Sequence, residues 1–272
     1  MEAAARDAAG ESDIRARLAE ESRALLQRLT VLQSTDSTNS LLARLPAEQR
    51  HAHAVIADMQ TAGRGRRQRS WHSPPGGNLY LSLGWRLEQG GLPLSTLPLM
   101  TAVCVCRALD RTGLHGHGIK WPNDILVSGR KLAGILVESQ SAPGGALVAV
   151  IGVGVNLSMP QAGARVIDRP WTDLAELLPA GAGRPDRDLL AALLLDALLP
   201  ALETFAVGGF EPFRDEWNRR DLLAGRRVRL EGEDEVRTGK ALGIEANGGL
   251  LVDIDGQGQQ VLHAADVSIA NA

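Results

Sequence analysis

A short run of arginines and glycines is the strongest chemical signal in the chain. Between Gln60 and Trp71 the sequence holds four arginines and no acidic residue, and glycines alternate with the first two arginines. Glycine lets the backbone approach a ligand closely, and guanidinium groups offer forked donors to phosphate or carboxylate oxygens. The segment lacks the G-x-x-x-x-G-K-[ST] pattern of a P-loop. It predicts a loop that binds a small anionic ligand, with a solvated flexible loop and a nucleic-acid-binding loop as alternatives.

Lysine is rare in this chain, which makes the position of each lysine informative. Of the 29 basic residues, only Lys120, Lys131 and Lys240 are lysines. Lys120 begins a Lys-Trp-Pro-Asn-Asp segment, in which proline forces an extended corner, and Lys131 begins a predicted strand beside a tight turn. Lysine supplies a compact point charge that arginine does not mimic. The first two lysines are therefore candidates for chemistry, although a plain turn and coincidence are equally open explanations.

Two further polar groups stand at places where a ligand could meet them. Ser37, Thr38 and Asn39 precede a predicted helix, where such residues usually serve as an N-cap. Asn156 ends an apolar run in which glycine occupies two alternate positions. Glycine thins a strand where a ligand packs against the backbone. The first group is expected to cap a helix or to meet a polar head group, and Asn156 can pair with a base edge.

Hydrophobic spacing predicts the elements that carry these residues. Ile14, Leu18, Leu25 and Leu29 fit one stripe of a helix. A Ser-Gly-Arg turn between two apolar runs is typical of a β-hairpin. Together the patterns predict helices over 13–29, 97–109 and 189–205, and strands over 55–58, 79–85, 125–127, 132–138 and 147–155.

The order of these elements predicts the fold class. Strands followed by helices are typical of an α+β fold, here a mixed β-sheet with helices packed on one face. We expect Asp186 or Asp188 to cap the last long helix and Pro200 to kink or split it. After a boundary near Asp221, short strands alternate with glycine turns, which predicts a small β-barrel. Its five strands are expected over 227–230, 240–244, 250–254, 260–263 and 267–269.

Composition excludes several classes of protein. The chain has 272 residues, 44% of them apolar, and a net charge of -3, which argues against a general polyanion binder. No apolar run is long enough to predict a membrane-spanning helix, and the acidic N-terminus has no signal-peptide core. Two cysteines, two residues apart, make neither a disulfide framework nor a metal site. A reducing, cytoplasmic compartment is the expectation.

Taken together, the segments resemble the biotin protein ligases, also called biotin–[acetyl-CoA-carboxylase] ligases. The resemblance runs from about residue 31 to the C-terminus, and it rests on ordered motifs at 36–39, 60–71, 73–80, 120–124, 130–138 and 152–156. It implies that ATP activates biotin as biotinyl-5′-AMP, which then biotinylates a specific lysine of the biotin carboxyl carrier protein. Mg²⁺ would bridge the ATP phosphates without a dedicated protein site.

The resemblance also implies a domain organisation. It divides the chain into an N-terminal tail and short helix (1–30), a biotin/lipoate ligase-type catalytic domain (31–221) and an SH3-like C-terminal domain (222–272). Bifunctional members carry an N-terminal winged helix, and the roughly 30 residues before the motifs are too few for such a module. We therefore expect the monofunctional type, with no DNA binding and no membrane association, as a monomer or weak homodimer.

Residue roles follow from the resemblance, position by position. The catalytic residues implied are Lys131, Arg66, Lys120 and Asp124. Biotin is expected to meet Ser37, Thr38, Asn39, Gln60, Arg64, Gly65, Arg66, Lys131 and Gly134. ATP and the adenylate are expected to meet Arg64, Arg66, Arg67, Trp71, Asn156, Trp171 and Lys120.

Two other functions remain open at this point. A lipoate–protein ligase uses the same adenylate chemistry and a related fold, although the Gly-Arg loop and the Lys-Trp-Pro-Asn-Asp segment resemble the biotin branch. An Arg-loop nucleic-acid-binding module is the alternative from another class, and the net charge of -3 argues against it. A catalytically inactive scaffold is disfavoured because every candidate ligand position is filled.

Overall fold

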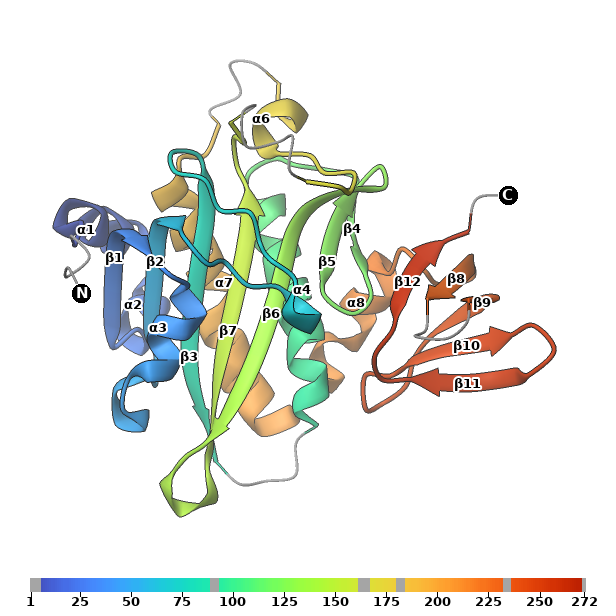
Figure 1. Ribbon diagram of the computed structural model, residues 1–272. Coiled ribbons are helices and arrows are strands. Elements are labelled where there is room, and N and C mark those ends of the chain that lie inside the picture. The colour runs from blue at the N-terminus through green and yellow to red at the C-terminus, as the bar shows by residue number, and fades with distance from the viewer. Residues whose placement is uncertain (1–5, 89–92, 161–166, 180–183, 232–235, 271–272) are drawn as a thin grey trace.

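A seven-stranded mixed sheet forms the larger of two layers of β-structure (Figure 1). The computed structural model describes residues 6–88, 93–160, 167–179, 184–231 and 236–270. The strand order is β1-β2-β3-β7-β6-β5-β4, with β1 and β2 parallel and the other neighbours antiparallel. The strands are β1 (Arg28–Thr35), β2 (His53–Gln60), β3 (Asn78–Leu87), β4 (His117–Lys120), β5 (Asp124–Val127), β6 (Arg130–Ser141) and β7 (Leu147–Asn156). This arrangement confirms the predicted α+β class.

Helices cover the two faces of this sheet unequally (Figure 1). They are α1 (Ala8–Arg17), α2 (Glu20–Leu25), α3 (Thr38–Arg44), α4 (Leu97–Asp110), α6 (Leu174–Leu177), α7 (Arg187–Gly208) and α8 (Arg214–Arg220). Ile151 and Val153 belong to the main core with α4 and α7, whereas Val150 packs with Leu42 of α3 on the other face. Side chains alternate between faces along a strand, so one strand serves both layers. The predicted restriction of helices to one face is therefore wrong at α3.

The helix predicted over 13–29 is not continuous: it breaks at Leu18 and ends at Leu25. Leu18 is extended after α1, a short α2 follows, and the chain enters β1 at Arg28. Leu29 continues the helical spacing by chance, but it belongs to β1, which pairs with β2. Ile14 and Leu18 are buried in the main core, and the predicted domain limit after residue 30 falls inside β1.

Helix α7 is the longest helix described. Asp186 caps it by accepting a hydrogen bond from the Leu189 backbone nitrogen at 2.6 Å, and the helix continues through Pro200 without splitting. The helix is apolar and long enough to cross a membrane by composition alone. It packs against α4, α1 and β3, so its apolar character is that of a core helix.

The C-terminal residues form five antiparallel strands in the order β11-β10-β9-β8-β12. Their bounds are β8 (Arg227–Glu231), β9 (Val236–Ile244), β10 (Leu250–Ile254), β11 (Gly258–Leu262) and β12 (Asp266–Ile269). Gly248 and Gly256 have φ values of 81° and 73°, as turn glycines require. The strands were expected to close into a barrel, but in the described part of the chain β12 pairs only with β8 and the sheet stays open.

Contacts between the two sheets are specific rather than merely apolar. The indole nitrogen of buried Trp121 donates to the Gly248 carbonyl at 2.9 Å, and the Ser95 hydroxyl donates to the Asn247 carbonyl at 2.7 Å. The turn between β9 and β10 is thereby fixed against the larger sheet. Strand β12 approaches the Arg-rich segment at its first residue, because Arg69 forms an ion pair with Asp266.

Candidate active site

Two connected cavities lie on the face of the sheet that carries α3. The narrow one, of about 60 Å³, is enclosed by α3, the Arg-rich segment and the strands β3, β6 and β7. The larger one, of about 720 Å³, extends towards β12 of the C-terminal sheet. Residues that line both include Gln60, Gly65, Arg66, Trp71 and Lys131. These residues stand where a ligand that occupied both cavities would pass from one to the other.

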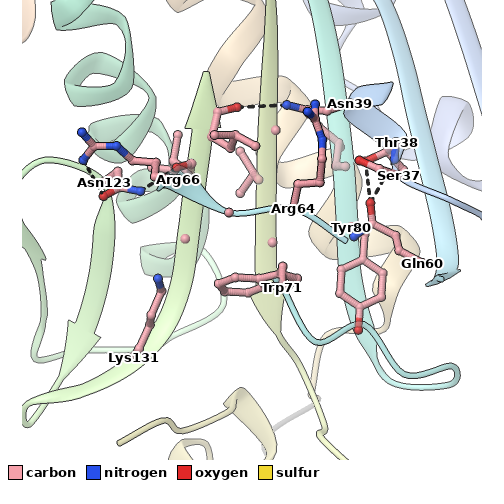
Figure 2. A pocket seen from close by; sticks show the side chains of 18 residues that line it. Ser37, Thr38, Asn39, Gln60, Arg64, Arg66, Trp71, Tyr80, Asn123 and Lys131 are labelled. Carbon is pink, nitrogen blue, oxygen red and sulfur yellow. Dashed lines mark hydrogen bonds between the residues drawn. The ribbon is translucent and has the colours of Figure 1, made fainter. Parts of the chain in front are cut away.

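The Trp71 ring lies over strands β6 and β7 (Figure 2), against the backbone of two glycines. A Cβ atom at Gly134 would stand 2.8 Å from the Trp71 ring, and one at Gly154 would stand 2.7 Å from it. The strand glycines therefore permit close approach of a flat ring. The Lys131 ammonium lies 5.0 Å from the centroid of the same indole, within cation–π range.

The start of α3 supplies polar groups to the narrow cavity. Ser37 caps the helix by accepting from the Ser40 nitrogen, so the N-cap interpretation is confirmed, and Ser37 also lines the cavity. The side-chain oxygen Gln60 Oε1 accepts from the Thr38 backbone nitrogen at 2.9 Å. Thr38 and Asn39 are buried. Donors and acceptors thus surround a compact, mostly enclosed space.

Cations and one carboxylate face each other at the junction of the cavities. Lys131 Nζ lies 2.6 Å from Asp124 Oδ1, in an ion pair whose angles are not those of a hydrogen bond. Lys120 is the cross-strand partner of Asp124 and lines the larger cavity. Burial lowers the pKa of Lys120, with nearby Lys131 acting in the same direction and Asp124 opposing. Burial also lowers the pKa of Arg66.

We call residues 62–70 the Arg loop. It is held by partners from separate elements. Arg64 pairs with Glu138 of β6, and Arg66 Nη1 donates to Asn123 Oδ1 at 3.3 Å. Arg67 lies 3.3 Å from Asp266 of β12, and Arg69 forms a second ion pair with that carboxylate. The loop therefore closes over both cavities and reaches the C-terminal sheet.

The backbone of this loop does not adopt its shape by intrinsic preference. Arg67 and Gln68 have φ values of 53° and 59°, and such left-handed conformations cost roughly 1–2 kcal/mol per residue. Burial opposes ionisation of Asp266, but the hydrogen bond from Arg69 and the charges of Arg69 and Arg67 lower its pKa. The carboxylate thus offsets both backbone strain and the repulsion between guanidinium groups.

Asp266→Asn is expected to loosen the Arg loop without unfolding the protein. The substitution removes the charge that pairs with Arg67 and Arg69, so trypsin should cleave within the loop several-fold faster. Cleavage is followed by mass spectrometry in the absence of ligand. Asp255→Asn is the matched control, because Asp255 pairs with Arg227 on the same sheet, away from the loop. Equal cleavage rates in both variants would contradict the anchoring role.

Asn156 and Trp171 line the larger cavity but already have partners. The Asn156 amide donates to the carbonyls of Lys131 at 3.3 Å and Thr172 at 3.0 Å. A parallel bridge joins Trp171 to Lys131. These contacts fix the 170–172 segment beside β6. The roles of Asn156 in reading adenine and of Trp171 as a stacking platform stay predictions.

All residues implied by the resemblance lie along these two cavities. Lining only the narrow cavity are Ser37, Thr38, Asn39, Arg64 and Gly134. Lining only the larger cavity are Arg67, Lys120, Asp124, Asn156 and Trp171. Five further residues at or beside the cavities were not predicted from the sequence: Tyr80, Ser82, Asn123, Glu138 and Asp266. Tyr80, Asn123 and Glu138 lie within the quoted motifs, whereas no sequence signal marks Ser82 or Asp266.

No preformed metal site accompanies the cavities. Within the described ranges, no group of three or more histidine, cysteine or acidic side chains is placed to hold a metal ion. Both cysteines are buried, and burial raises the pKa of each thiol to about 12. The thiols therefore stay protonated at neutral pH and belong to the core of α4.

Comparison with known proteins identifies the family. A model of the "Biotin/lipoate A/B protein ligase family" matches residues 31–156, and one of the "Biotin protein ligase C terminal domain" matches residues 224–269. The bifunctional ligase/repressor BirA of Escherichia coli K12 is 41% identical over 228 residues, which are 84% of this chain and 70% of that protein. The biotin–[acetyl-CoA-carboxylase] ligase of Paracoccus denitrificans is 33% identical over 247 residues, 87% of this chain and 98% of the relative.

A solved structure shares the fold over most of the chain. The biotin protein ligase from Aquifex aeolicus, in complex with biotin and ATP, superposes with a TM-score of 0.71 at 27% identity, covering 90% of this chain and 100% of that one. The family model and the shared fold thus place the chain in the class of biotin and lipoate protein ligases. Within that class, the chain belongs to the biotin protein ligase family.

Proposed function

We propose that this protein is an ATP-dependent biotin protein ligase that forms biotinyl-5′-AMP and transfers biotin to a lysine of a carboxylase carrier protein. The observation that carries the proposal is the position of Lys131 at the junction of a narrow cavity and a larger cationic one. Biotin would enter the narrow cavity and ATP the larger one. Their reacting groups would then meet beside the Lys131 ammonium.

The first step brings two anions together. The biotin carboxylate attacks the α-phosphorus of ATP, an acyl–phosphate bond forms, and pyrophosphate leaves with the electron pair of the broken bond. Lys131 and Arg66 line both cavities and can offset the repulsion. Mg²⁺ would arrive with the nucleotide and neutralise its phosphates. The described residues offer it no separate cluster of ligands.

In the second step, the lysine amine of the carrier attacks the acyl carbon and AMP leaves. A free lysine has a pKa of about 10.4, so the amine must lose a proton before attack. Asp124 lines the larger cavity and is the candidate that orients or deprotonates this amine. We assign Lys120 to the departing phosphate, because its ammonium lies in the same cavity.

The carrier protein of acetyl-CoA carboxylase is the partner that the relatives' names imply. A cytoplasmic location and a monomeric or weakly dimeric state complete the proposal. The nucleic-acid alternative fits the Arg loop poorly. Arg64, Arg67 and Arg69 are paired with the protein's own Glu138 and Asp266, so few of the loop's charges are left for an extended polyanion.

The direct test is incubation of the purified chain with ATP, Mg²⁺, a biotin carboxyl carrier domain and either biotin or lipoate. We expect biotin-dependent exchange of pyrophosphate into ATP and a biotin-sized mass increase on the carrier. Lipoate-dependent exchange with no biotin-dependent exchange would replace the proposal with the lipoate alternative. Absence of both activities would reject adenylate chemistry for this chain.

Gly154→Ala is expected to raise the biotin KM about tenfold. A displacement of about 1 Å in a group that positions the substrate can lower the reaction rate by as much as about 100-fold. The added methyl would meet the Trp71 ring at 2.7 Å, so the ring must move off the cavity floor. Steady-state exchange assays at varied biotin measure the effect. Gly208→Ala, at the end of α7, is the control. An unchanged KM would show that the ring position is irrelevant to biotin.

A further inference from the structure

Side-chain hydrogen bonds run around the narrow cavity from one end of the Arg loop to the other. At one end, Ser73 Oγ donates to the Trp71 carbonyl at 3.0 Å and accepts from Gln60 Nε2 at 2.9 Å. Thr38 then joins Gln60 to Ser82: its backbone nitrogen donates to Gln60 Oε1 at 2.9 Å, and its hydroxyl oxygen lies 2.7 Å from Ser82 Oγ, to which it can donate. These residues come from β2, β3, α3 and the segment that follows the Arg loop, so the bonds link separate parts of the cavity wall.

The other half of the chain ends on a carboxylate. Ser82 Oγ donates to Asn39 Oδ1 at 2.5 Å, and Asn39 Nδ2 donates to Glu138 Oε2 at 3.0 Å. The same Glu138 oxygen accepts from the Arg64 guanidinium. The hydrogen-bonded chain therefore begins at Trp71 and ends at Arg64, on the two flanks of the Arg loop. Figure 2 shows Asn39, Thr38 and Gln60 along this wall.

Glu138 fixes the direction of these bonds. An ionised carboxylate only accepts hydrogen bonds, so it must face the NH₂ group of Asn39. The Asn39 oxygen is then directed at Ser82, which has a single hydroxyl proton to donate. A reversed amide would place oxygen against both the carboxylate and the Leu136 carbonyl, which lies 3.3 Å from Nδ2.

The Asn39 amide is tightly packed against strand β7. A Cβ atom at Gly152 would stand 2.3 Å from Asn39 Oδ1, so the amide lies directly on the backbone of β7. Asn39 is 4% exposed, and a buried amide that loses a partner is left with an unsatisfied polar group. The orientation of the amide thus depends on its protein partners, and among the described residues that bond to it, Glu138 carries the charge.

We propose that Glu138 is a positioning residue for the ligase reaction. Through Asn39 it determines which groups of the narrow cavity donate hydrogen bonds and which accept them, and its ion pair with Arg64 holds the Arg loop in place. The inference rests on the proposed function and adds a residue to it. Arg64 then acts through this ion pair, and the phosphates are met by cations that line the larger cavity, among them Arg66 and Lys131.

An exchange of donor and acceptor tests this polarity. Glu138→Gln is expected to weaken biotin binding about tenfold, the loss of one charged hydrogen bond. Asn39→Asp should weaken it further, because two carboxylates would face each other. The double variant Asn39→Asp/Glu138→Gln restores one donor opposite one acceptor, so its affinity should recover to that of Glu138→Gln alone. Affinity for biotin is measured by titration calorimetry without ATP, beside the biotin KM and kcat.

The matched control is Glu211→Gln, which removes an exposed ion pair with Arg214 far from the cavities and should leave binding unchanged. Wild-type affinity in Glu138→Gln, or a double variant as weak as the product of the single effects, overturns the assignment. Failure of the proposed function is a separate result, because the wild-type chain would then show no biotin-dependent exchange.

Discussion

Lys131→Ala is expected to reduce the rate of biotinyl-AMP formation about 1,000-fold, which is the upper end of the range for removing one preorganised donor from a reacting oxyanion. Two effects act together. The carboxylate and the α-phosphate lose the cation at the junction of the cavities, and Asp124 loses the partner 2.6 Å away. An unpaired negative charge is then left where two further anions must meet. The effect should fall on the chemical step more than on ATP affinity.

Biotin-dependent exchange of labelled pyrophosphate measures this first step without the carrier protein. Lys240→Ala is the control, because it removes the one lysine of the C-terminal sheet, outside both cavities. Exchange at more than a tenth of the wild-type rate in Lys131→Ala would remove Lys131 from the catalytic role. Lys131→Arg should restore little activity, since the guanidinium is planar and larger than the ammonium.

Asp124→Asn is expected to slow transfer from preformed biotinyl-AMP by roughly 100- to 1,000-fold, within the usual contribution of a general base. Pyrophosphate exchange should fall much less, because loss of a negative charge also relieves repulsion with the incoming anions. Without the carboxylate, attack depends on the free amine in solution. At pH values below the pKa of the acceptor lysine, the residual rate should therefore rise about tenfold for each unit by which the pH is increased.

A single-turnover assay with preformed adenylate and excess carrier domain separates this step from activation. Asp253→Asn, on β10, is the matched control outside both cavities. Transfer at the wild-type rate would exclude Asp124 from the second step. A slow transfer whose ratio to wild type stays constant with pH would leave Asp124 an orienting role only, without proton transfer.

The fold was predictable where local patterns and tertiary structure agree. The C-terminal strands follow their glycine turns closely, and the strand of 147–155 is found as Leu147–Asn156. Strand β1 was missed because Leu29 happens to continue the apolar spacing of the preceding helices. Strand β4, only His117–Lys120, is too short for a periodic signal. Pairing with β2 and with β5 decides these two segments, and pairing is not a local property.

The site was predictable to the extent that motifs mark it. The ordered motifs predicted the site residues, and all of the residues so predicted lie along the two cavities. The partners of the Arg loop could not be predicted in the same way. Glu138 and Asp266 are two of 32 acidic residues, and only the folded chain shows which of them face the arginines.

The alternation of side chains along β7 has a consequence for how such a protein changes during evolution. Ile151 and Val153 face the helical core, whereas Gly152 and Gly154 face the cavities. Residues that secure the fold and residues that shape the ligand space thus occupy interleaved positions of one strand. Mutations on one face leave the packing of the other largely intact. Ligand preference can therefore drift between lineages while the scaffold retains its folding stability.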